Sequence, residues 1–152
     1  MDWVLGYSGG LHIAPQEYIP AYVPSDVQMV FGAAKGMRDY HYANSYEDYK
    51  WMEDKWWFYK SSLFVDQKPG RTPILEFEGL DYRYTVLLDG AAAADGEGLY
   101  TPVRLDLSGF TGRTVQVTVA LHPIPKREGA GEGRQEASLS CIPPVAYGWD
   151  WQ

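Results

Sequence analysis

Residues 74–90 read ILEFEGLDYRYTVLLDG, and this stretch decides the fold class. Apolar and acidic side chains alternate over residues 75–78, which is the period of a strand with one buried face. A second run, residues 82–88, is rich in aromatic and aliphatic side chains and stops at Asp89-Gly90, a dipeptide typical of tight turns. Two short strands in close succession predict antiparallel β-structure.

Similar patterns lie on both sides of this stretch. Residues 57–65 are rich in aromatic and aliphatic side chains, and a short strand is expected around residues 105–107 before a turn at 108–112. Residues 115–121 alternate most cleanly between apolar and polar positions. Because no long helical pattern separates these strands, a parallel α/β fold is not expected. The chain is predicted to be all-β, an antiparallel jelly-roll β-sandwich.

The first fifty residues are irregular and rich in Gly, Pro and Tyr, with one helix signal. Ser25 followed by Gln28 is a capping pair, and an apolar run comes with it. Pro24 precedes the cap and fixes the entry of the chain. Gly32 is expected to end the helix after about two turns. The prediction is therefore a short N-terminal helix beside the sandwich.

Composition narrows the classes of partner. The chain has 152 residues, which suits one domain. Its net charge of −7 offers no basic patch for nucleic acid. No apolar run approaches the ~20 residues that cross a membrane. Six Trp and twelve Tyr exceed what a core of this size needs, and such a surplus often marks a binding surface. An enlarged aromatic core explains the same surplus.

The chain has a single cysteine, Cys141. It allows no intrachain disulfide, which slightly favours a cytoplasmic location and leaves the compartment open. No histidine is near it in sequence, so an inert thiol is expected rather than a nucleophile.

Neither a catalytic carboxylate pair nor a metal site stands out. Glu76 and Glu78 would lie ~6.6 Å apart along a strand, within the spacing of inverting glycosidases. Their alternation with apolar residues already accounts for them as solvated positions. His12, His41 and His122 are far apart in sequence and have no ligand spacing. No catalytic residue, metal or other cofactor is expected in this chain, although a structural calcium stays undecided.

An ordered series of motifs resembles the N-terminal sugar-binding domain of glycoside hydrolase family two. Residues 77–90 are similar to the family signature F-x-G-L-D-x-x-A-x-V-x-L-N-G, departing at Tyr84 and Asp89. The chain end resembles the G-W-D-W motif of the β-mannosidase and exo-glucosaminidase branch. The other matching segments are Ala21-Tyr22-Val23-Pro24, Asp39-Tyr40-His41-Tyr42 with Asn44, Trp51-Met52-Glu53, and Trp57-Phe58-Tyr59 with Phe64.

This resemblance implies a galactose-binding-type jelly roll that precedes an immunoglobulin-like sandwich and a catalytic barrel. The family hydrolyses β-glycosides with retention, and its two catalytic Glu residues lie in the barrel. The resemblance maps a sugar contact onto Asp150, with Trp149 and Trp151 walling the pocket and Asn44 nearby. The implied partners are a β-linked carbohydrate and the other domains of the same parent chain.

Residues 1–152 are expected to form one domain, cut from a longer multidomain glycoside hydrolase, because the aromatic end 147–152 would need a covering surface. Two alternatives stay open. One is a free-standing carbohydrate-binding module with an aromatic platform of Trp51, Trp56 and Trp57. The other is a structural spacer without a ligand. The sequence does not name the sugar, the linkage or the oligomeric state.

Overall fold

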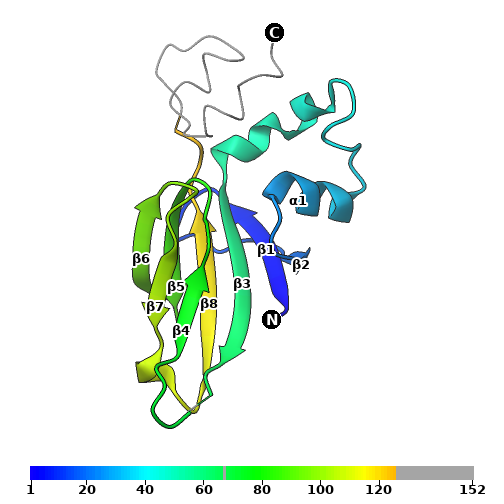
Figure 1. Cartoon of the computed structure of the whole chain (residues 1–152). Coiled ribbons are helices and arrows are strands. Elements are labelled where there is room, and N and C mark those ends of the chain that lie inside the picture. The colour runs from blue at the N-terminus through cyan, green and yellow to red at the C-terminus, as the bar shows by residue number, and fades with distance from the viewer. Residues whose placement is uncertain (67, 126–152) are drawn as a thin grey trace.

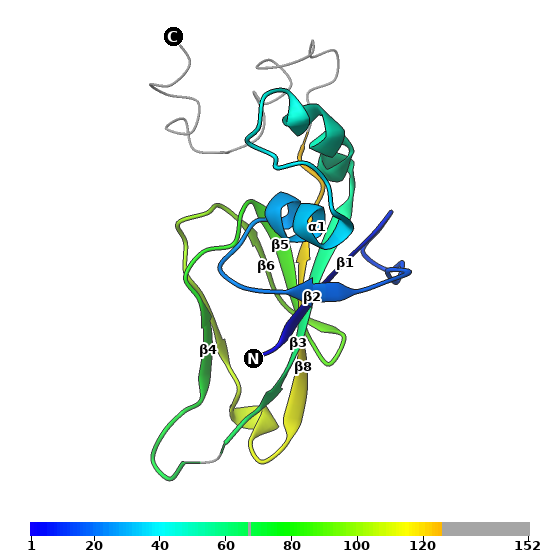
Figure 2. The same cartoon turned by 90° about the vertical axis from the view of Figure 1, so that its right-hand side faces the viewer.

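A computed structural model describes residues 1–66 and 68–125 of the chain. Two antiparallel sheets face each other as layers (Figures 1 and 2). The large sheet has the order β2-β1-β3-β8-β5-β6 and the small sheet has the order β4-β7. The prediction of an all-β antiparallel sandwich is confirmed. The bounds of the large sheet are β1 Trp3–Ser8, β2 Ile19–Ala21, β3 Trp56–Phe64, β5 Arg83–Leu88, β6 Ala91–Glu97 and β8 Thr114–Leu121.

Alternation along β8 places its valines on the inner face of the large sheet. Val115, Val117 and Val119 are all buried, with 3% exposure or less. Tyr59 of β3 and Val86 of β5 are both registered against Val119, so the three strands present one continuous apolar face. This face is the floor of the hydrophobic core.

The small sheet covers part of that floor. It consists of β4 (Ile74–Phe77) and β7 (Val103–Asp106), paired from Ile74 opposite Asp106 to Phe77 opposite Val103. Leu75 and Phe77 pack against the core cluster. Glu76, one position along, is exposed, as the alternation predicts.

Helix α1 (Val27–Lys35) corrects the predicted capping residue and the predicted end. The N-cap is Asp26, whose carboxylate accepts the Met29 N–H at 2.7 Å. Gly32 lies inside the helix, where a side chain would collide with the phenol of Tyr49, so the glycine allows close packing and does not end the helix. The helix ends at the left-handed Gly36 instead, as helices commonly do.

Other regular elements went unrecognised in the sequence. The 3-10 helix η1 (Ser45–Asp54) begins within the first fifty residues, which were predicted to be irregular, and β1 and β2 also lie there. Strand β6 contains four consecutive alanines, a residue with little preference for strands, and hydrogen bonding to β5 sets its conformation. A second 3-10 helix, η2 (Ser108–Phe110), lies within the predicted turn.

The turn predicted at Asp89-Gly90 connects β5 to β6. Both residues have positive φ angles, 50° and 83°, which is the geometry of a type I′ hairpin turn. The Asp89 carboxylate accepts the Gln116 N–H at 2.8 Å and an Arg113 N–H at 2.7 Å. These bonds tie the hairpin to β8. The loop predicted over residues 126–135 lies outside the described residues. Among those the structure describes, no helix is long and apolar enough to cross a membrane.

Candidate functional site

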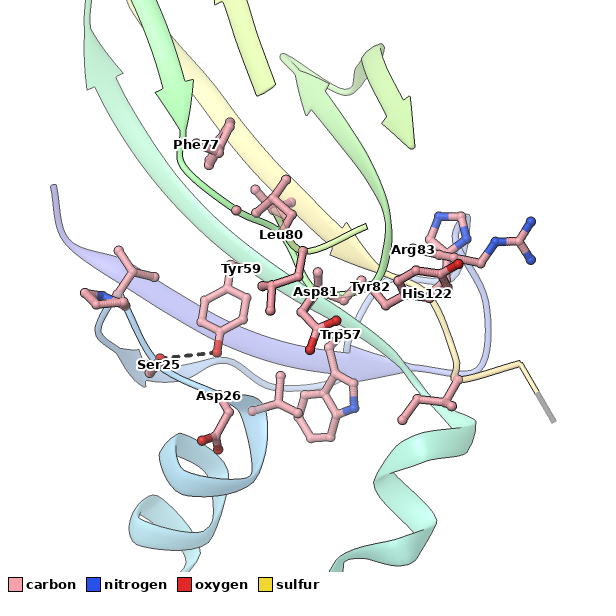
Figure 3. A pocket seen from close by; sticks show the side chains of 18 of the residues that line it. Ser25, Asp26, Trp57, Tyr59, Phe77, Leu80, Asp81, Tyr82, Arg83 and His122 are labelled. Atoms are coloured by element: carbon pink, nitrogen blue, oxygen red, sulfur yellow. Dashed lines mark hydrogen bonds between the residues drawn. The ribbon is translucent and has the colours of Figure 1, made fainter. Parts of the chain in front are cut away.

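A cavity of about 640 Å³ opens at the end of the sandwich where β4 and β8 finish (Figure 3). Its floor is the inner face of β1, β3 and β8, and its walls come from the start of α1 and from the residues after β4. The chain reaches the cavity again at residues 122–125, after β8. The floor side chains are Trp3, Trp57, Tyr59, Val119 and Leu121.

Trp57 joins three elements beneath this cavity. Its indole N–H donates to the Met52 carbonyl at 2.9 Å, which attaches η1 to the sheet. Its ring centroid lies 5.3 Å from that of Phe31 on α1 and 5.1 Å from that of Tyr7 on β1. Because Trp57 is only 3% exposed, its ring serves packing and offers no open face to a ligand.

A few polar groups converge on the apolar floor. The Tyr59 hydroxyl lies 3.4 Å from the Ser25 hydroxyl, and the dashed line in Figure 3 marks this hydrogen bond. Burial raises the pKa of Tyr59, so the phenol is neutral at ordinary pH. Asp81 also lines the cavity, and desolvation raises the pKa of its carboxyl although the residue keeps contact with solvent.

His122 lies at the cavity mouth in a polar setting. Its Nε2 lies 2.8 Å from the Thr85 hydroxyl, and its ring centroid lies 4.2 Å from that of Trp56, with the two ring planes tilted by 42°. Burial lowers the pKa of His122, the Arg83 guanidinium lowers it further, and Asp95 opposes the shift. The imidazole is therefore neutral near pH 7, and its contacts with Trp56 and Thr85 hold it on the outer face of the large sheet.

The described residues do not form a catalytic or metal-binding set. Glu76 pairs with Arg104 at 2.9 Å across the small sheet, a structural ion pair on the surface. Glu78 follows β4 and is exposed. Within residues 1–66 and 68–125, no group of three or more His, Cys, Asp or Glu could hold a metal ion. The cavity can enclose an apolar group with a few polar contacts.

Of the four predicted sugar-contact residues, one lies in the described part of the chain. Asn44 is exposed at the start of η1, and its side chain makes no capping bond there. Asp150, Trp149 and Trp151 lie outside the described residues. Sequence reasoning did not single out Ser25, Tyr59 and Asp81 as members of one site, because they are brought together only by the crossing of α1, β3 and the segment after β4.

The aromatic platform suggested for a free-standing module is not formed. Trp56 and Trp57 are consecutive in β3, so their side chains point to opposite faces of the sheet. Trp51 packs beside Phe31 and Tyr7 in the core. Many of the surplus aromatic side chains therefore belong to the hydrophobic core.

The fold defines the class of the protein, a two-layer antiparallel β-sandwich domain with a cavity at one end. The family model described as "Glycosyl hydrolase 2 galactose-binding domain-like" matches residues 11–152. The chain therefore belongs to the galactose-binding-like domains of glycoside hydrolase family two, as the motifs predicted.

Curated relatives are fungal enzymes. Beta-mannosidase B of Aspergillus flavus is 30% identical over 100 residues, which are 62% of this chain and 12% of the relative. Beta-mannosidase B of Aspergillus clavatus is 32% identical over 90 residues, which are 57% of this chain and 10% of the relative. The chain thus spans only about a tenth of the relatives it matches.

Solved structures agree on the fold. The β-D-mannosidase of Dictyoglomus thermophilum superposes with a TM-score of 0.75 at 17% identity, covering 99% of this chain and 20% of that enzyme. The β-glucuronidase of Faecalibacterium prausnitzii superposes with a TM-score of 0.55 at 19% identity, covering 80% of this chain and 20% of that enzyme. The match to a β-mannosidase extends over nearly the whole chain.

Proposed function

We propose that this domain is the N-terminal part of a retaining, β-mannosidase-like glycosidase and supplies non-catalytic contacts to the sugar pocket. The observation that carries the proposal is the family match over residues 11–152, a range that includes Gly-Trp-Asp-Trp at 148–151. The similarity to proteins named β-mannosidase supports it. The parent chain contributes the catalytic carboxylates from another domain. Residues 1–152 are one domain of that longer polypeptide.

Asp150 is the residue proposed to contact the sugar. A carboxylate between two indoles can accept hydrogen bonds from two sugar hydroxyls, and such charge-assisted bonds are strong where water is excluded. Trp149 and Trp151 would pack on the C–H face of the sugar, and Asn44 is the fourth proposed contact. If these bonds strengthen in the transition state, they raise kcat as well as affinity.

The test is Asp150→Ala in the full parent enzyme, assayed on an aryl β-mannoside. Loss of two charge-assisted bonds should lower kcat/KM on the order of 10²–10³-fold. The control is Asp95→Ala, which removes an exposed carboxylate from β6. Unchanged kcat/KM in the Asp150 variant would refute the proposed contact, while a drop in both variants would indicate damage to the domain.

A second measurement separates this role from an independent binding module. Tryptophan fluorescence of the 152-residue chain is titrated with mannose, glucosamine, galactose, glucuronic acid and short β-linked oligosaccharides. The proposed role predicts no saturable response, because the catalytic domain completes the pocket. Saturation by one sugar would instead identify a free-standing module and its ligand.

A further inference from the structure

Residues 122–125, which follow β8, are attached to two other elements through the backbone. The His122 N–H donates to the Arg83 carbonyl at 2.9 Å, which continues the pairing of β8 with β5. The Ile124 N–H donates to the Glu53 carbonyl of η1 at 2.8 Å. Because proline has no backbone N–H, His122 and Ile124 supply the backbone donors of this stretch.

The His122 side chain adds a third attachment, on the outer face of the large sheet. Its Nε2 lies 2.8 Å from the hydroxyl of Thr85, a residue that is only 8% exposed. Its ring centroid lies 4.2 Å from that of Trp56, the residue with which β3 begins after η1. The register pairs Trp57 with Leu121, so Trp56 and His122 are neighbours on adjacent strands. One imidazole therefore joins the end of β8 to β5 and to the start of β3.

Charged groups near the imidazole come from β5 and β6. Figure 3 shows the Arg83 side chain of β5 next to His122. Asp95 and Glu97 belong to β6, and Glu97 pairs with Arg83 at 3.3 Å. Burial opposes a positive charge on the ring most strongly, Arg83 opposes it further, and Asp95 favours it. From β3 the ring meets only the uncharged indole of Trp56 among the contacts described.

We propose that His122, Trp56 and Thr85 form an acid-sensitive clasp that opens when the imidazole takes up a proton. In the closed clasp the ring is half-buried and its pKa is lowered, whereas in the open clasp it reaches water and titrates near the ordinary pKa of about 6.5. The open clasp therefore binds the proton more tightly, and acid shifts the equilibrium toward it. The closed clasp keeps its full stability above about pH 6.5 and loses it as the pH falls toward the lowered pKa.

The clasp controls one wall of the cavity. Pro123, Ile124 and Pro125 line the cavity, and they follow His122 directly in the chain. Because the imidazole lies on the outer face of the sheet, its protonation loosens this wall without any ligand in the cavity. The inference goes beyond the proposed function and does not depend on a sugar contact at Asp150.

Amide hydrogen exchange of Ile124 in the unmodified 152-residue chain reports whether the clasp is closed. Its protection, corrected for the intrinsic exchange rate, should fall by up to about tenfold per pH unit below about pH 6.5, the limit for uptake of one proton. His122→Gln keeps a polar side chain beside Thr85 but does not titrate, so Ile124 protection should not vary with pH in this variant. His12→Gln, at an exposed histidine, is the matched control and should behave like the unmodified chain.

Three results of this exchange experiment would overturn the proposal. The first is protection of Ile124 that does not change with pH in the unmodified chain. The second is a pH dependence that survives His122→Gln, and the third is a pH dependence that is lost in His12→Gln.

The neighbouring charges test the direction of the effect without altering the ring. Arg83→Gln removes the cation that opposes protonation, so the pKa of His122 should rise and Ile124 should lose less protection in acid. Asp95→Asn removes the carboxylate that favours protonation and should have the opposite effects. Proton NMR of the imidazole measures the His122 pKa directly, which also tests the proposal if His122→Gln fails to fold. A pKa at or above about 6.5 in the unmodified chain, or shifts of the same sign in both charge variants, would overturn the proposal.

Discussion

Replacing Trp57 with phenylalanine tests whether this indole connects η1 and α1 to the large sheet. The change removes the N–H that donates to the Met52 carbonyl at 2.9 Å, beside a Met52 side chain that is only 1% exposed. The Met52 carbonyl keeps the Lys55 N–H at 3.2 Å, so losing the indole hydrogen bond costs about 0.5–1.5 kcal/mol. The phenyl ring also buries up to ~50 Å² less apolar surface, worth about 1 kcal/mol. The expected loss of unfolding free energy is therefore about 1.5–2.5 kcal/mol.

Trp56→Phe is the matched control, because it makes the same chemical change one position away on the opposite face of β3. Trp56 is only half-buried and packs on the His122 ring, and a phenyl ring can keep that contact. The expected loss is below about 1 kcal/mol.

Urea unfolding followed by far-ultraviolet circular dichroism measures both variants without relying on tryptophan emission. A variant that loses stability should shift the midpoint and keep the slope. Equal losses for the two variants would refute the assignment of Trp57 to the core and of Trp56 to the outer face. An unchanged Trp57→Phe protein would refute the hydrogen bond to Met52.

The remaining predictions concern a helix cap and a turn. Asp26→Ala should lower the unfolding free energy by about 1 kcal/mol in thermal unfolding, because the Met29 N–H loses its acceptor, whereas Asp26→Asn keeps a cap and should cost little; equal losses would argue against the cap. The Gln116 N–H and then Arg113 lower the pKa of Asp89, so its stabilising contribution is present above the unfolded pKa of about 3.9 and is lost as pH falls through the folded value. Asp89→Asn should therefore lose less stability than the parent below about pH 4, and identical acid unfolding curves would contradict this.

Strand alternation made much of the sandwich predictable. The run 115–121 corresponds to β8, and the Asp89-Gly90 signal corresponds to the β5–β6 turn, because local chemistry dictates both. Strand β6, with its alanine run, was missed because the pairing partner rather than local preference makes it a strand. The sequence predicted the position of helix α1 but ended it too early. Gly32 is needed for close packing against Tyr49 and does not stop the helix.

Only part of the candidate site could be predicted from the sequence. Motif order identified the family and assigned Asp150 a role that stays a prediction. The cavity was not foreseeable, because Ser25, Tyr59 and Asp81 belong to segments far apart in the chain and meet only through packing. The proposed aromatic platform failed for a related reason, since neighbouring residues of a strand face opposite sides.

By itself, the sequence determined the class of fold, the family and the expected sugar contacts, because strand periodicity, turn chemistry and short motifs are local properties of the chain. Tertiary structure alone decided which aromatic residues became core and where the cavity lies. These properties depend on the register of distant strands. Shifting a strand by one residue would exchange its buried and exposed faces without changing any local pattern.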